Sequence, residues 1–165
     1  MGVGSSIQNL EDINNIERPI SVEQEVNTLE QLHIIDILYS EYDDNESYYS
    51  SNSKRDILKK GFIVKYGKKR LDEFLNNNNI NLLITAHQFV KEGFCTFNND
   101  KLLVLFSATN YMDKYNNVGG MITIAKKTAN KRLNIIPKLI NLNNDKKELY
   151  RKKESSSPVK INKHK

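Results

Sequence analysis

The stretch LVLFSATNY, from Leu103 to Tyr111, determines most of what this sequence predicts. Its first four residues are apolar and rich in branched side chains, which is typical of a buried strand. The strand continues directly into a polar loop, residues 107–117, that carries Tyr111. Such a loop can be an ordinary connection between strands, or it can hold polar groups over an active site.

A second apolar run ends close to a histidine. Residues 80–85 read as a short buried strand, and His87 follows two positions later. Ligand sites of α/β proteins are built where strands end, so His87 is a candidate site residue. From spacing alone, a single histidine is more often structural than a ligand, and neither HExxH nor GxSxG occurs in the sequence. His33 lies in an apolar stretch, where packing is the expected role, and no role is expected for His164.

The rest of the chain predicts a mixture of helices and strands. Helices are expected over residues 9–16 and 68–77, Ser21 resembles a helix N-cap, and residues 29–38 fit either a helix or a strand. Strands are expected over the following ranges: 61–67, 93–98 and 101–106 as a hairpin, 118–125, and 133–140 interrupted by Pro137. Residues 43–54 are expected to form an exposed loop. This order favours a mixed α/β sandwich over a doubly wound fold.

Length, charge and cysteine content narrow the class of protein to which the chain can belong. The 165 residues are enough for one domain with a modest core. Residues 1–142 contain 17 basic and 17 acidic side chains, whereas residues 143–165 contain 8 and 3, so the net charge of +5 belongs to a basic tail that is expected to be disordered. A neutral body argues against nucleic acid as a partner. No apolar run reaches the length of a membrane span, and the pattern of residues 1–7 does not predict a secretory signal. One cysteine, Cys95, favours a reducing compartment, cytoplasmic or nuclear.

Four short blocks of the sequence stand out together: Ala86-His87-Gln88, Gly93-Phe94, residues 105–111 and residues 116–119. In residues and spacing they resemble the C-terminal half of the catalytic domain of phosphoprotein phosphatases, the two-metal serine/threonine protein phosphatases. Residues 107–111 and 136–140 look most like the Kelch-repeat (BSU-like) branch. The resemblance covers Gly2 to Asn141. It implies an α/β (α+β mixed) fold, the C-terminal part of a metallophosphatase-type β-sandwich flanked by helices, over residues 1–142.

The resemblance also implies a site. Family members bind two divalent metals, of the Mn, Fe or Zn type, that activate a water for attack on phosphorus. By residue-for-residue matching, His87 is a metal ligand, Tyr111 overhangs the metal pair and helps position phosphate, and Lys60 stands where the family has a phosphate-contacting arginine. The motifs GDxHG, GDxxDRG and GNHE, which hold most of the metal ligands, do not occur in this sequence.

Two departures from the family pattern concern phosphate binding. Thr85 replaces the arginine before Ala86-His87, and Lys60 keeps the charge of an arginine but not its bidentate fork. The first hypothesis is a part of a metal-dependent phosphatase for phosphoserine and phosphothreonine, inactive alone, whose partners are phosphoproteins and the upstream half of the domain or a regulatory protein. The alternative is a non-catalytic pseudophosphatase that acts as a protein-interaction module. An unrelated structural or nucleic-acid-binding protein fits the neutral body least well.

Overall fold

The computed structural model describes residues 2–20, 22, 26–56, 60–126 and 133–140. Within these ranges helices and strands are intermixed along the chain, as the sequence predicts. The elements, in chain order, are α1 (Leu10–Asn14), α2 (Leu29–Tyr39), β1 (Glu41–Tyr42), β2 (Tyr49–Ser51), β3 (Val64–Tyr66), α3 (Lys68–Asn77), β4 (Leu83–Thr85), β5 (Phe94–Phe97), β6 (Leu102–Leu105), the 3₁₀ turn η1 (Tyr111–Asp113), β7 (Gly119–Lys126) and β8 (Leu133–Ile140).

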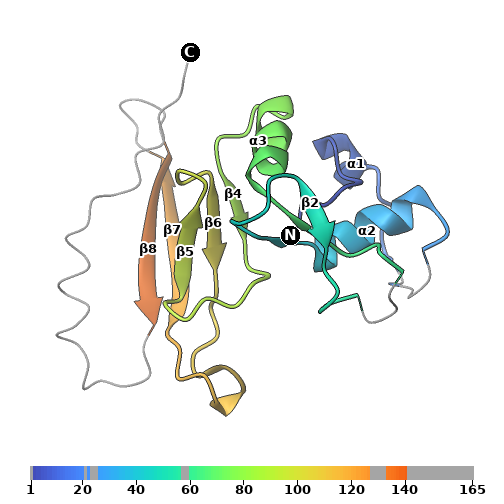
Figure 1. Ribbon diagram of the computed structural model, residues 1–165. Coiled ribbons are helices and arrows are strands. Elements are labelled where there is room, and N and C mark those ends of the chain that lie inside the picture. The colour runs from blue at the N-terminus through green and yellow to red at the C-terminus, as the bar shows by residue number, and fades with distance from the viewer. Residues whose placement is uncertain (1, 21, 23–25, 57–59, 127–132, 141–165) are drawn as a thin grey trace.

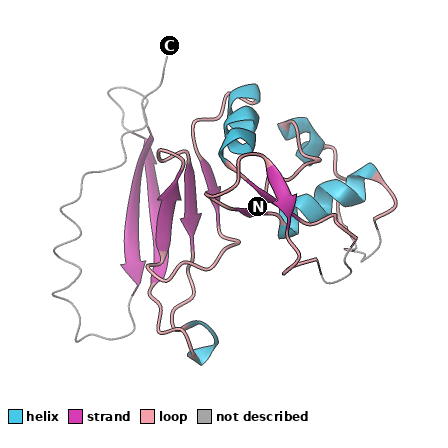
Figure 2. Cartoon of the chain, viewed as in Figure 1, coloured by secondary structure: helices cyan, strands magenta, loops and turns pink. Residues whose placement is uncertain are grey.

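The described strands form three small sheets. In the first, β3 lies between β1, which is parallel to it, and the antiparallel β2. In the second, β6 lies between the parallel β4 and the antiparallel β5. The third is the antiparallel pair β7–β8. Strands β4 to β8 stand side by side, and the three α-helices gather beyond β4 (Figures 1 and 2).

Helix α3 supplies one side of the core. It spans Lys68–Asn77, as its pattern of apolar residues predicts, and Leu71, Phe74 and Leu75 are at most 2% exposed. These side chains belong to one buried cluster with Val3 of the N-terminal segment and Leu102 of β6. The core therefore joins the beginning of the chain to the central strand of the second sheet.

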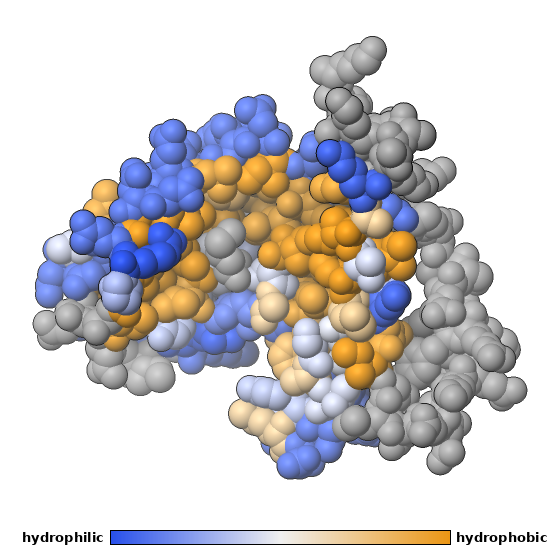
Figure 3. Space-filling view, turned by 180° about the vertical axis from the view of Figure 1, so that it is seen from behind, coloured by the Kyte–Doolittle hydropathy of each residue, from blue (hydrophilic) through white to orange (hydrophobic). Residues whose placement is uncertain are grey.

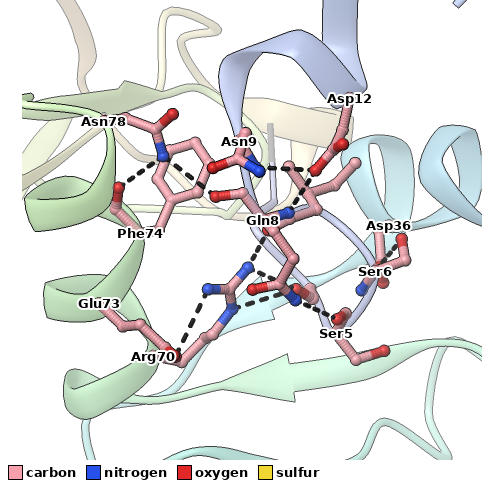
Figure 4. A network of polar contacts seen from close by, with 12 residues as sticks. Ser5, Ser6, Gln8, Asn9, Asp12, Asp36, Arg70, Glu73, Phe74 and Asn78 are labelled. Carbon is pink, nitrogen blue, oxygen red and sulfur yellow. Dashed lines mark hydrogen bonds and ion pairs between the residues drawn. The ribbon is translucent and has the colours of Figure 1, made fainter.

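Two buried charged residues fasten the N-terminal segment (Figure 4). The Asp36 carboxylate accepts hydrogen bonds from the backbone N–H and the hydroxyl of Ser6, both at 2.6 Å, and from the hydroxyl of Ser40 at 2.9 Å. The Arg70 guanidinium, which is fully buried, donates to the carbonyls of Gly4 and Ile7. A Cβ at Gly4 would collide with the Asp36 carboxylate, so the close approach requires glycine here.

The structure confirms several predicted elements. Residues 94–97 and 102–105 form the expected hairpin, and its turn residues Asn98, Asn99 and Asp100 have φ values of 49°, 53° and 62°. The ambiguous stretch that begins at residue 29 is helix α2, whose N-cap Thr28 accepts a hydrogen bond from the Gln31 amide at 3.2 Å. The expected N-cap at Ser21 and the tail over residues 143–165 lie outside the described residues.

Two expectations about strands were wrong. Residues 43–54 are not loop throughout, because Tyr49–Ser51 pairs with β3 as strand β2. Strand β8 runs unbroken through Pro137, which is in register with Ile122 of β7. Proline lacks a backbone N–H, and strands of a two-stranded sheet have an outer edge where that N–H is not needed.

Both strands of the β7–β8 pair carry exposed apolar side chains, which the register divides between the two faces of the pair. Large side chains with 40–56% of their surface exposed lie on these strands: Met121, Ile124, Leu133, Ile136 and Ile140. Figure 3 shows broad apolar surface on the face of the molecule that it presents. Apolar areas of this extent are unusual for a monomer. Within the described parts of the chain, no helix has the length and hydrophobicity that a membrane span requires.

Candidate metal and phosphate site

Two parallel strands bring His87 and Tyr111 to the same edge of a sheet. Strands β4 and β6 pair in parallel, with Thr85 opposite Val104. His87 follows the end of β4, and Tyr111 lies in the loop that follows β6. Because the carboxyl ends of parallel strands face the same way, both candidate residues belong to one edge, the kind of edge at which ligands bind in α/β proteins.

The imidazole of His87 has an unusual surrounding. Its Nε2 atom is buried and has no hydrogen-bond partner among the described residues. Burial lowers the pKa of His87, and the positive charge of Arg55 lowers it further, whereas Glu41 and the backbone of Tyr39 oppose the shift. The imidazole is therefore held in its neutral form near pH 7, which is the form that ligates metals. A buried, unpaired and neutral imidazole nitrogen fits a metal ligand.

The side chain of Gln88 fastens the histidine segment to strand β1. The backbone N–H of Tyr42 donates to Gln88 Oε1 at 3.1 Å, and Gln88 Nε2 donates to the Tyr42 carbonyl at 2.8 Å. These two bonds satisfy both polar ends of the amide. They also join the strand that begins at Glu41 to the segment that carries His87.

Glu41 organises a polar cluster next to the histidine. Arg55 Nε donates to Glu41 Oε1 at 2.6 Å, and Asn52 Nδ2 donates to Glu41 Oε2 at 2.9 Å. The backbone N–H of Arg55 also donates to the Asn52 carbonyl at 3.0 Å. Arg55 carries no sequence signal of a site, because it directly follows the low-complexity residues 43–54 at no motif spacing and meets Glu41 only through the turn after β2.

Four aromatic rings connect the Tyr111 loop to the histidine segment; we call Phe89, Phe106, Tyr111 and Tyr115 the aromatic cluster. The ring of Phe106 meets that of Tyr111 edge-on at 5.2 Å, and Phe89 lies 6.4 Å from Tyr111 and 4.9 Å from Tyr115. Phe89 is two residues beyond His87, so the cluster ties the two candidate segments together. Tyr111 itself remains 39% exposed and accessible to a ligand.

Asn117 holds the Tyr111 loop in shape. Its side-chain Oδ1 accepts from the Tyr111 amide at 2.7 Å, and its Nδ2 donates to the carbonyls of Ala108 at 2.6 Å and Val118 at 3.0 Å. The loop needs this support, because Asn110, Met112 and Asp113 all have φ between 45° and 55°. Such left-handed conformations are costly for residues other than glycine unless their surroundings hold them.

We expect Asn117→Ala to loosen this loop. The substitution removes one acceptor and two donor contacts from a side chain that is 6% exposed, which should cost about 1–3 kcal/mol locally. Hydrogen exchange of the Tyr111 amide should accelerate, on the order of tenfold or more. Asn117→Asp is the matched control, since it keeps the acceptor for Tyr111 and should protect that amide better than alanine does. Equal exchange rates in wild type and Asn117→Ala would contradict the clamp.

Lys60 lies apart from these contacts as far as the described residues show. Its side chain is exposed, and its backbone N–H donates to Asp56 Oδ1 at 3.3 Å. Its predicted role in phosphate binding stays a prediction. Within the described ranges, no three His, Cys, Asp or Glu side chains gather into a group that could hold a metal ion.

Comparison with known proteins links these features. No protein-family profile matches the sequence. Over 140 residues, 85% of the chain, the sequence is 35% identical to the serine/threonine-protein phosphatase BSL2 of Arabidopsis thaliana, and it spans 12% of that protein. The fold matches a solved serine/threonine phosphatase from Saccharomyces cerevisiae with similarity to human phosphatase PP5. That match has a TM-score of 0.62 at 22% identity and covers 85% of this chain and 42% of the yeast chain.

The two comparisons point to the same family of enzymes. The sequence match carries the family relationship, and the structural match carries the fold. The mixed architecture of small sheets with few helices is the one that the matched phosphatase region has. The chain thus belongs to the phosphoprotein phosphatase family, in its BSU-like branch, and corresponds to the C-terminal part of the serine/threonine phosphatase catalytic domain.

Proposed function

We propose that this chain supplies the C-terminal part of the active site of a metal-dependent protein phosphatase acting on phosphoserine and phosphothreonine. The observation that carries the proposal is the buried Nε2 of His87, which has no hydrogen-bond partner among the described residues. An unpaired buried nitrogen costs free energy unless a ligand satisfies it. A metal ion bound in the complete domain would do so.

Each named residue has a role in this proposal. His87 would hold one of two divalent metals, and Gln88 would orient the segment that carries it. The metal pair, when bound, supplies a water activated for attack on phosphorus and neutralises developing charge. Tyr111, held by the Asn117 clamp, presents its partly exposed hydroxyl-bearing ring from the same edge of the sheet. A tyrosine there would donate a hydrogen bond to a phosphate oxygen.

A single histidine does not hold a metal pair, since each divalent ion needs several ligands. The proposal therefore includes a partner segment: the upstream half of a phosphatase catalytic domain, which would bring the remaining ligands. The exposed apolar side chains of β7 and β8 support a larger assembly. Phosphoproteins are the proposed substrates, and the cytoplasm or nucleus is the proposed location.

Complementation tests the proposal. We expect the 165-residue chain alone to release no phosphate from a phosphoserine peptide. Co-expressed with the N-terminal part of the BSL2 catalytic domain, it should form a complex with activity that requires Mn²⁺ and disappears with a chelator. The N-terminal part alone is the control. A stable complex that stays inactive with Mn²⁺ would favour the pseudophosphatase alternative instead.

A further inference from the structure

We propose that Arg55, rather than Lys60, is the phosphate-contacting cation of this chain. This inference rests on the proposed function, because it names the residue that would bind the phosphate of the substrate. It reassigns a role that matching of sequence blocks gave to Lys60. The reasons are the position of Arg55, the atoms it leaves available and the chemistry of its side chain.

Three hydrogen bonds locate Arg55. Gln88 binds both backbone polar groups of Tyr42, at 3.1 and 2.8 Å, and so joins the strand of Glu41 to the segment that carries His87. Glu41 in turn binds Arg55 at 2.6 Å. The positive charge of Arg55 also lowers the pKa of His87, in agreement with this arrangement.

The binding atoms of Arg55 are available. Only its Nε contacts Glu41, so the two terminal nitrogens make no hydrogen bond to any residue that the structure describes. The side chain of Arg55 is 36% exposed, whereas that of Glu41 is 21% exposed. Glu41, itself held by Asn52 at 2.9 Å, therefore orients the guanidinium from one side and leaves its outer edge open to a ligand.

The side chains of Arg55 and Lys60 differ in how well they can bind phosphate. A guanidinium offers two parallel N–H groups that match the spacing of two phosphate oxygens, whereas an ammonium is a compact point charge. Lys60 is exposed, and within the described part of the chain it is its backbone N–H that makes a hydrogen bond, to Asp56. A fixed fork loses less freedom on binding than a free lysine does. Arg55 is therefore the better-placed group for an oxyanion.

Titration of the full 165-residue chain with inorganic phosphate tests this inference without any need for activity. The ¹⁵N-labelled protein has five arginines, so the side-chain Nε–H signal of Arg55 can be assigned by its loss in Arg55→Gln. We expect phosphate to shift this signal and the ring signals of His87 in a saturable way. Arg55→Gln should weaken phosphate binding about tenfold or more, and Arg55→Lys should weaken it less.

Two further variants make the result decisive. Lys60→Gln should change phosphate affinity by less than about twofold, since it leaves the Arg55 fork intact. Glu41→Gln weakens the ion pair but keeps the fork, and it removes a negative charge beside the anion, so affinity should stay the same or rise. A Glu41→Gln variant as weak as Arg55→Gln would reduce Arg55 to a structural role and overturn the inference. So would an affinity that depends on Lys60 and not on Arg55, or the absence of saturable phosphate shifts.

The test of Arg55 can fail or succeed independently of the test of the proposed phosphatase function. Phosphate binding at Arg55 in a chain whose complemented domain stays inactive would leave the anion site standing and count against the phosphatase. If the complemented domain is active and Arg55→Gln leaves that activity unchanged, the phosphatase stands and the anion site at Arg55 is refuted. Amide spectra of each variant, compared with wild type, show that the fold is retained.

Discussion

His87→Ala is expected to abolish the Mn²⁺-dependent activity of the complemented domain, lowering it by a factor on the order of 100 or more. The imidazole is the candidate metal ligand, and alanine has no atom that could replace Nε2. Loss of even an outer-shell partner of a metal costs tenfold or more, so loss of a ligand should cost at least as much. Phosphate release from a phosphoserine peptide measures the effect.

The metal content of the complex provides a second measurement. Loss of a histidine with a purely structural role would leave this content unchanged. The purified complex carrying His87→Ala should contain less Mn²⁺ per protein than the wild-type complex, by elemental analysis. His164→Ala is the matched control, because it removes the same side chain from the C-terminal stretch, and its activity and metal content should equal those of wild type. Full activity in the His87→Ala complex would refute the ligand assignment.

Phe74→Ala is expected to lower the free energy of unfolding by about 3–5 kcal/mol. Phe74 is fully buried in helix α3 and packs in the cluster that joins the N-terminal segment to β6. Alanine would leave a cavity at this junction, and the loss is a large part of the roughly 5–15 kcal/mol that stabilises an ordinary domain. Urea unfolding followed by far-ultraviolet circular dichroism measures the change in midpoint.

The control for this prediction lies on the same helix. Asn76 is exposed, and Asn76→Ala should change the free energy of unfolding by less than about 0.5 kcal/mol. The two variants alter opposite faces of α3. Comparing them separates the effect of a lost buried side chain on the free energy of unfolding from the effect of a change in helix propensity. If Phe74→Ala unfolded at the same urea concentration as Asn76→Ala, the core described here would not be the one that stabilises the chain.

Helix α3 and the β5–β6 hairpin were predictable from the sequence, because each is specified locally. The spacing of Leu71, Phe74 and Leu75 allows one apolar face and hence one helix. The residues Asn98-Asn99-Asp100 tolerate left-handed conformations and so favour a turn between two apolar runs. The candidacy of His87 and Tyr111 was also available from the sequence, because both follow apolar runs at the spacing of a known family.

Strand β2 was not predictable from its own residues. Tyr49–Ser51 lies in a polar, low-complexity stretch whose composition indicates a loop, and it becomes a strand only because β3 offers it a partner. The unbroken course of strand β8 through Pro137 also depends on tertiary structure. A proline is tolerated in a strand only where the tertiary arrangement leaves an outer edge.

By itself, the sequence determined the family, the order of the elements and three candidate site residues, His87, Tyr111 and Lys60. Only the tertiary structure decided that Arg55 pairs with Glu41 and that Gln88 holds the strand of Glu41 to the segment of His87. Local patterns report on residues within a turn or a strand of one another, whereas the bonds of Gln88 to Tyr42 and of Glu41 to Arg55 join residues 46 and 14 positions apart. Contacts over such separations depend on how whole elements pack, and no short stretch of sequence encodes them.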